Sequence, residues 1–275
     1  MLKWRLLLTT LPIVAAVLIL KTVLSSAFHF GGWIDFTDTA LVLTGGIFLI
    51  GFMLAGTMAD YKESEKLPAE LAAQLETLED SLAHAVAVND SPIDRSTVMG
   101  VHRGMAQTIY GWLMKRNTQE DMFDSLHQVA LTLRDLEKQG VHGGAAGKMT
   151  GDVDKIRKAV TRLAVISRTG FLATGYALLE MLIVLIICLL MISTFTSRAA
   201  EVIVIVFVTL IYIYMYRLIK DIDDPFEYSP DGQQGTSEVA LFPLTEYLER
   251  FDKRLGLTDG GRASFDSPDG RRMPR

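Results

Sequence analysis

The chain has 275 residues, 49% of them hydrophobic, a mean hydropathy of +0.27 and a formal net charge of −5. A soluble domain of this length usually has a mean hydropathy below zero, so the excess apolar residues must lie in long runs. The acidic balance argues against a nucleic-acid-binding surface, so we expect no nucleic acid among the partners. The single cysteine, Cys188, excludes an intrachain disulfide framework.

Four apolar runs account for this excess. Each run approaches or exceeds the roughly 20 residues that a helix needs to cross a hydrocarbon core about 30 Å thick. The runs show no alternation of apolar and polar residues, so they predict helices rather than barrel strands. The predicted fold class is therefore an all-α membrane protein with four transmembrane helices, embedded in a lipid bilayer. The runs cover residues 6–24, 39–58, 171–193 and 202–219.

The first run also resembles a secretory signal peptide. Basic residues precede it, and Ser25-Ser26-Ala27 offers a cleavage site. The apolar stretch is long for a signal peptide and Pro12 kinks it, which favours an uncleaved membrane anchor. Cleavage remains the alternative.

Lysine and arginine residues at the ends of the runs predict the orientation in the membrane. On one side the flanks carry only Lys21 and Arg198, beside acidic residues. The asymmetry predicts that the N-terminus, the segment between the second and third runs, and the C-terminus are cytosolic. We expect a multi-pass protein of the cell inner (plasma) membrane. The basic residues on the cytosolic side are Lys3, Arg5, Lys62, Lys66, Arg162, Arg168, Arg217 and Lys220.

The same pattern divides the chain into five segments. Residues 1–59 contain the first two transmembrane helices, and residues 169–220 contain the other two. Between them, residues 60–168 form a cytosolic helical bundle inserted between spans two and three. Residues 221–255 form a cytosolic C-terminal segment with a short amphipathic helix. Residues 256–275 are rich in glycine, aspartate and arginine and are predicted to be disordered.

Within the inserted segment, apolar residues recur at helical spacing, which is typical of a packed bundle. Thr118 with Asp121 three residues later predicts the start of one helix through a capping box. Residues 140–151 are glycine-rich but fail the phosphate-loop pattern, because Met149 stands where serine or threonine should hold magnesium. We interpret them as a flexible linker. A last helix is predicted from Asp152 and should continue unbroken into the third span.

The sequence offers no constellation of catalytic or metal-binding residues. The histidines never fall at metal-ligand spacing, and we interpret them as scattered surface residues. We therefore expect no enzyme, no cofactor and no metal site. The histidines are His29, His84, His102, His127 and His142.

Glu180 is an acidic residue inside the third span. A charge at a helix centre costs about 2.5–3.5 kcal/mol on insertion scales, so Glu180 should face protein or water, as a pore residue or an intramembrane polar site. The alternative is that it lies in the cytosolic half of the span and reaches the interface or a neighbouring hydroxyl. The residue pattern leaves both open.

The second span mixes glycine with large apolar side chains. Phe48 and Phe52 are four residues apart and therefore share one face of the helix. Small residues allow helices to approach closely, against copies of the same helix or against its neighbours. A stripe of this kind usually indicates helix packing. The alternative, which is a more specific functional hypothesis, is a ring of side chains that lines a pore. The glycines are Gly45, Gly46, Gly51 and Gly56.

Two short segments resemble the bestrophins. Phe48-Leu49-Ile50-Gly51-Phe52, followed by Leu67-Pro68, is similar to the F-x-x-G-F segment of the second bestrophin span and the Leu-Pro at its exit. Asp224-Pro225-Phe226 is similar to the Asn-Pro-Phe-Gly that follows the last bestrophin span. The order of spans and insert also agrees over most of residues 1–255. The nearest relatives expected are bacterial bestrophin-like proteins.

The resemblance implies a homo-oligomeric ion channel with the second span lining a central pore. Bestrophins are pentamers that mostly pass chloride and other small inorganic anions, although some bacterial members prefer cations. We therefore expect an anion channel of five subunits, with four as the second expectation. The alternative function is a non-conducting membrane scaffold or sensor that acts through its cytosolic helical domain.

The resemblance also assigns residues. Phe48 and Phe52 would form the apolar neck of the pore, and Asp224-Pro225-Phe226 the turn after the last span. Thr44 stands where bestrophins place a third apolar side chain, which makes a less tight neck. The calcium clasp of animal bestrophins is a dense acidic run after Pro-Phe. Residues 227–231 are too sparsely acidic for such a clasp, so no calcium gating is expected.

Overall fold

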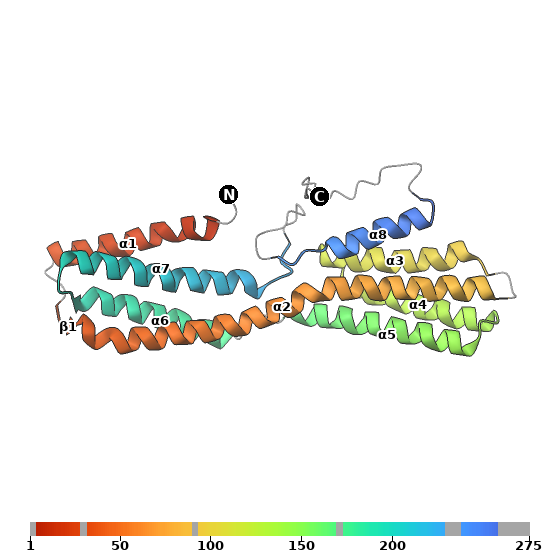
Figure 1. Cartoon of the computed structure of the whole chain (residues 1–275), viewed down its shortest axis with the longest axis horizontal. Helices are drawn as coiled ribbons and strands as arrows, with labels where there is room; N and C mark the ends of the chain where they lie inside the picture. The colour runs from red at the N-terminus through yellow and green to blue at the C-terminus, as the bar shows by residue number, and fades with distance from the viewer. Residues whose placement is uncertain (1–3, 28–31, 90–92, 169–172, 229–237, 258–275) are drawn as a thin grey trace, which may run out of the picture. The chain divides into compact units, whose positions relative to one another are not determined.

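The computed structural model divides into two compact units, which are described separately (Figure 1). The membrane unit comprises Met1–Lys62 and Thr169–Pro225, and the bundle unit comprises Glu63–Arg168 and Phe226–Arg275. Helix α2 (Phe36–Val88) contributes its first part to the membrane unit and the rest to the bundle unit. The predicted disordered tail, 256–275, lies outside the described residues except for its first two. The structure describes residues 4–27, 32–89, 93–168, 173–228 and 238–257.

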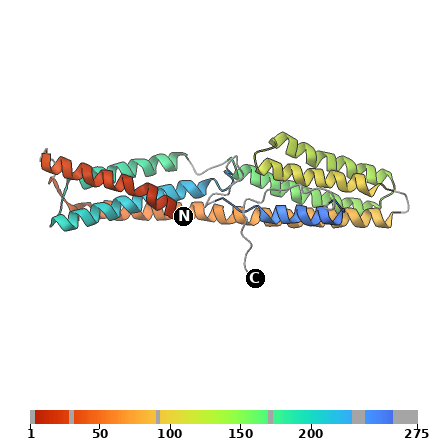
Figure 2. The ribbon, with the colours of Figure 1, turned by 90° about the horizontal axis from the view of Figure 1, so that it is seen from above.

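The membrane unit contains four helices that are long and apolar enough to cross a membrane. They are α1 (Arg5–Ala27), the first part of α2, α6 (Ala173–Ile192) and α7 (Arg198–Asp223). Helix α1 runs beside α7, and α6 packs against α7 (Figures 1 and 2). The predicted all-α membrane fold with four transmembrane helices is confirmed.

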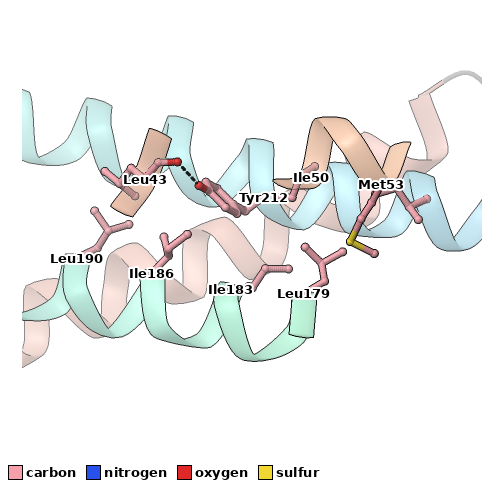
Figure 3. Close-up of a cluster of buried hydrophobic side chains, with 9 residues drawn as sticks. Leu43, Ile50, Met53, Leu179, Ile183, Ile186, Leu190 and Tyr212 are labelled. Atoms are coloured by element: carbon pink, nitrogen blue, oxygen red, sulfur yellow. Dashed lines mark hydrogen bonds between the residues drawn. The ribbon is translucent and has the colours of Figure 1, made fainter. Parts of the chain in front are cut away.

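Helices α2, α6 and α7 share one apolar core (Figure 3). Only 22–28% of the most apolar window of each spanning helix is buried inside the chain. The remaining apolar surface must therefore be covered by lipid or by other copies of the chain, since apolar surface of this extent is not stable in water. The buried core residues are Leu43, Ile50, Met53, Leu179, Ile183, Ile186, Leu190, Tyr212 and Ile219.

Lys21 ties the end of α1 to the connection between α6 and α7. Its buried ammonium donates hydrogen bonds to the carbonyl oxygens of Met191 and Ser193, at 2.9 and 3.0 Å, and lies 3.7 Å from the Glu201 carboxylate. These partners compensate the charge that burial removes from water. In the same connection, β2 (Ser193–Thr194) pairs in parallel with β1 (Ile34–Asp35).

The bundle unit contains the second part of α2, α3 (Arg95–Leu113), α4 (Gln119–Lys138), α5 (Gly143–Ile166) and α8 (Phe242–Arg254). Helix α3 packs against α4 and α8, and α4 packs against α5. The leucines that recur at helical spacing after the second span are buried: Leu67, Leu71, Leu75, Leu78 and Leu82.

The predicted capping box at the start of α4 is confirmed. The Thr118 hydroxyl accepts a hydrogen bond from the Asp121 amide at 3.1 Å, and the Asp121 carboxylate accepts one from the Thr118 amide at 2.8 Å. Each side chain satisfies an amide that a helix start leaves without a partner.

Two expectations for the segment before the third span are wrong. Residues 140–151 are not a linker, because α5 begins at Gly143 and buries Ala146 and Met149. Packing of this face overrides the low helix propensity of the glycines. Helix α5 also does not continue into the third span. It ends at Ile166, and α6 begins at Ala173. The Ser167 amide closes the last turn of α5 by donating to the Leu163 carbonyl at 2.9 Å.

Candidate functional site

Helix α2 has two distinct faces in the membrane unit. Leu43, Ile50 and Met53 recur at helical spacing and point into the core formed with α6 and α7 (Figure 3). The opposite side, which we call the open face, is exposed along its whole length. Since 3.6 residues make one turn, these positions form one continuous stripe. The open face consists of Leu41, Thr44, Phe48, Phe52, Ala55 and Ala59.

The two phenylalanines dominate the open face. The side chain of Phe48 is 77% exposed and that of Phe52 is 72% exposed, so neither ring packs between helices of its own chain. Thr44, one turn before Phe48, is also exposed, and its hydroxyl donates to the Ala40 carbonyl at 2.9 Å. This bond turns the polar part of Thr44 back onto the helix backbone.

The glycines of α2 differ in how closely other helices of the chain approach them. A Cβ atom at Gly46 would overlap the Tyr212 hydroxyl and lie 2.9 Å from Cδ1 of Ile186, so any side chain there would force these neighbours to shift. At Gly45, Gly51 and Gly56 a Cβ atom would meet nothing within 4 Å. Close helix approach within one chain is therefore confined, among these glycines, to Gly46.

Tyr212 fixes α2 against α7 on the side away from the open face. Its hydroxyl donates a hydrogen bond of 2.6 Å to the Leu43 carbonyl, and the residue is 1% exposed (Figure 3). Tyr212 is thus a buried contact between α2 and α7.

Glu180 lies on α6 and accepts a hydrogen bond of 2.5 Å from the Tyr216 hydroxyl of α7. The Tyr216 ring in turn meets Tyr176 edge-on, with 6.3 Å between ring centroids. This contact gives the Glu180 carboxylate a polar partner on the neighbouring helix. A charge-assisted bond of this kind lowers the cost of a carboxylate in the span.

The segment Asp224-Pro225-Phe226 lies directly after the last span. Asp224 is the C-terminal cap residue of α7, and Pro225 and Phe226 form the turn that follows. The Phe226 side chain is only 3% exposed, and its carbonyl accepts a hydrogen bond from the Tyr228 amide at 3.0 Å. The turn is therefore a packed structural feature of the chain.

His102 corrects the interpretation of the histidines as surface residues. It lies on α3 with no exposed surface, and its Nε2 is 2.7 Å from the Tyr247 hydroxyl of α8. Burial lowers the pKa of His102 to about 4, because the charged imidazolium would lose its hydration. The signal was present in the sequence, since Val98, His102 and Met105 recur at helical spacing on the buried face.

Within the ranges that the structure describes, no three histidine, cysteine, aspartate or glutamate side chains gather as a metal site. In the membrane unit, the residues singled out from the sequence lie on the open face of α2 and in the polar pair of Glu180 and Tyr216 on α6 and α7. The open face carries the exposed side chains of Phe48 and Phe52.

No protein-family model matches the chain, and no curated protein matches it. Solved structures do. A bacterial bestrophin homolog from Klebsiella pneumoniae, phased by Zn-SAD, is 14% identical with a TM-score of 0.71, covering 93% of this chain and 99% of that one. A mutated form of such a Klebsiella pneumoniae homolog gives 13% identity, a TM-score of 0.71 and coverages of 90% and 98%. A crystallised mutant described as a membrane protein is 13% identical with a TM-score of 0.72, and the match covers 93% of this chain and 98% of that one. The resemblance noted in the sequence thus extends to three dimensions, and this membrane protein has the fold of the bacterial bestrophin homologs.

Proposed function

We propose that the chain is the subunit of a homo-oligomeric ion channel that passes chloride or other small inorganic anions. The open face of α2 lines the central pore. The observation that carries the proposal is the exposure of Phe48 and Phe52 on one face, at 77% and 72%, while the opposite face of the same helix is packed into the chain's core. The bestrophin-like fold supports it.

The proposed neck works by excluding water. In a ring of subunits, Phe48 and Phe52 form two successive aromatic constrictions, one helical turn apart. An apolar constriction gates by dewetting, because an ion loses its hydration there and gains no replacement ligands. Thr44 widens the outer end of the neck relative to a third apolar ring, since it is smaller and its hydroxyl is bonded to the Ala40 carbonyl.

The proposal needs identical subunits around an axis, since a closed ring is the simplest way to surround a pore with one helix. Five subunits are the first expectation and four the second. Native mass measurement in mild detergent should show one species larger than a dimer. We place the protein in the inner (plasma) membrane with both termini and the bundle unit on the cytosolic side.

Glu180 and the turn at Asp224, Pro225 and Phe226 have supporting roles in this proposal. Glu180 is an intramembrane polar site that links α6 to α7 through Tyr216. The turn ends the last span and leads the chain towards α8. Neither lies on the open face of α2, because Glu180 is on α6 and the turn follows α7.

The double variant Phe48→Ala, Phe52→Ala tests the neck. Removing both rings should raise ion flux per assembled channel in liposomes, because the dewetting barrier is lost. The matched control is Phe207→Ala on α7, a phenylalanine that is 61% exposed but lies on another helix. Its flux should equal that of the parent.

Assembly decides how the result is interpreted. If the double variant has the parent's mass and thermal stability but unchanged flux, the neck proposal is wrong. If it dissociates or loses stability, the rings pack between subunits instead, since truncating a buried phenylalanine costs about 3–5 kcal/mol. A correctly assembled parent without any ion flux would favour the non-conducting scaffold.

A further inference from the structure

The open face of α2 ends, on the predicted cytosolic side of the membrane unit, at a lysine. Lys62 follows Thr44 by 18 residues, which is about five full turns of a helix, so the two residues lie on the same side. Lys62 is exposed, like the other members of the open face. It stands about 15 Å along the helix from Phe52, at a rise of about 1.5 Å per residue.

Lys62 has no ion-pair partner in the described part of the chain, and its sequence neighbours explain why. Asp60 lies on the opposite side of the helix, because two residues turn it by about 200°. The Glu63 carboxylate is held by the Arg162 guanidinium, with hydrogen bonds of 2.9 and 2.8 Å. Lys62 is therefore not paired with Asp60 or Glu63.

We infer that Lys62 forms a ring of positive charge at the cytosolic mouth of the pore and gives the channel its preference for anions. The inference rests on the proposed function, because only a ring of subunits around α2 brings the lysines together. Like charges lining a confined passage raise the local concentration of ions of opposite sign. Each subunit contributes one lysine, so the local field grows with the number of subunits. The ions attracted are small inorganic anions.

The lysine lies on one side of the apolar part of α2. Asp38, in the first turn of α2, has the opposite sign and lies before the apolar part of the helix, whereas Lys62 lies after it. An anion concentrated at the cytosolic mouth would then meet the aromatic neck next. The ordinary alternative is that Lys62 merely lies among lipid headgroups, as lysines at cytosolic span ends often do.

The test is the ratio of chloride to potassium permeability of the purified full-length protein in planar bilayers. Lys62→Glu and Lys62→Gln should lower this ratio, by up to about tenfold for Glu in ~10 mM salt, where the Debye length is about 30 Å. The effect should shrink in ~1 M salt, where that length is about 3 Å. Lys62→Arg should keep the parent ratio. The control Lys220→Glu changes an exposed lysine of α7 in the same unit and should leave the ratio unchanged.

The outcomes separate this inference from the proposal beneath it. Variants that assemble and conduct with the parent's permeability ratio overturn the role of Lys62 and leave the channel intact. An equal fall in Lys62→Glu and Lys220→Glu overturns it too, since the effect would then come from general surface charge. A parent protein without ion flux overturns the proposed function, and the inference falls with it.

Discussion

The Tyr212 hydroxyl and the Leu43 carbonyl oxygen join two membrane helices across 169 residues of sequence, with a buried hydrogen bond of 2.6 Å. Tyr212 lies over Gly46, where a Cβ atom would come within 3.1 Å of the tyrosine ring and within 2.9 Å of Ile186. The contact holds one side of α2 against α7 and α6. The other side, with Phe48 and Phe52, is consequently the one that stays open.

The first prediction concerns this contact. Gly46→Ala should lower the melting temperature of the detergent-solubilised protein, because the added methyl group overlaps the Tyr212 hydroxyl. Tyr212→Phe alone should cost about 1 kcal/mol through the lost hydrogen bond. In the double variant the overlap is relieved, so its total loss should be smaller than the sum of the two single losses. Gly45→Ala, where nothing lies within 4 Å, is the control and should keep the melting temperature. Strict additivity would contradict the contact.

The second prediction is a pH dependence of the bundle unit. The folded pKa of His102 is about 4, below the roughly 6.5 of an exposed imidazole, so the unfolded chain binds more protons between these values. The free energy of unfolding should therefore fall as the pH drops from about 6.5 to about 4, by up to about 3 kcal/mol. Thermal unfolding of the parent across this range measures it.

The matched variants isolate His102 from the carboxylates that also titrate at low pH. His102→Gln should flatten the dependence between pH 6.5 and 4, although the variant is less stable throughout. His84→Gln changes an exposed histidine of α2 and should keep the parent's slope. If both variants keep the same slope, the buried His102 does not control acid stability.

The third prediction concerns the attachment of α8. The Arg254 guanidinium binds the Glu79 carboxylate through bonds of 2.7 and 2.6 Å, and the Glu79 side chain is only 8% exposed. Arg254→Ala should cost about 2–3 kcal/mol, because it leaves a buried carboxylate without its cation. Arg250→Ala, at the more exposed pair with Glu76, should cost less than about 1 kcal/mol. Proteolysis of α8 under native conditions should rise in the first variant only, and equal rates would speak against the role of burial.

The fourth prediction is topological. With Cys188 replaced by alanine, a cysteine at Thr37 should react with a membrane-impermeant reagent added to intact cells, whereas one at Glu70 should not. Both positions are exposed in the structure. Ser64 belongs to the same segment as Glu70 but is buried, so a label there would resist the reagent from either side. After lysis the Glu70 position should react, which controls for accessibility. Labelling of Glu70 in intact cells would place the bundle unit outside.

Some local features followed from sequence because their causes are local. The capping box at Thr118 and Asp121 depends on two side chains three residues apart, and it forms as predicted. The start of α5 was missed for the opposite reason. Glycines at 143–151 disfavour a helix locally, but burial of Ala146 and Met149 against the bundle stabilises one.

The sequence by itself determined the four spanning helices, because the length of an apolar run is compared directly with the thickness of the bilayer. It also determined that Phe48 and Phe52 share a face, since helical spacing alone requires it. The tertiary structure decided which face of α2 is open, because Tyr212 packs against Gly46 on the other face. It also decided the burial of His102, which contacts Tyr247 of α8. Both depend on residues more than 140 positions apart meeting in space, and no local pattern encodes such a meeting.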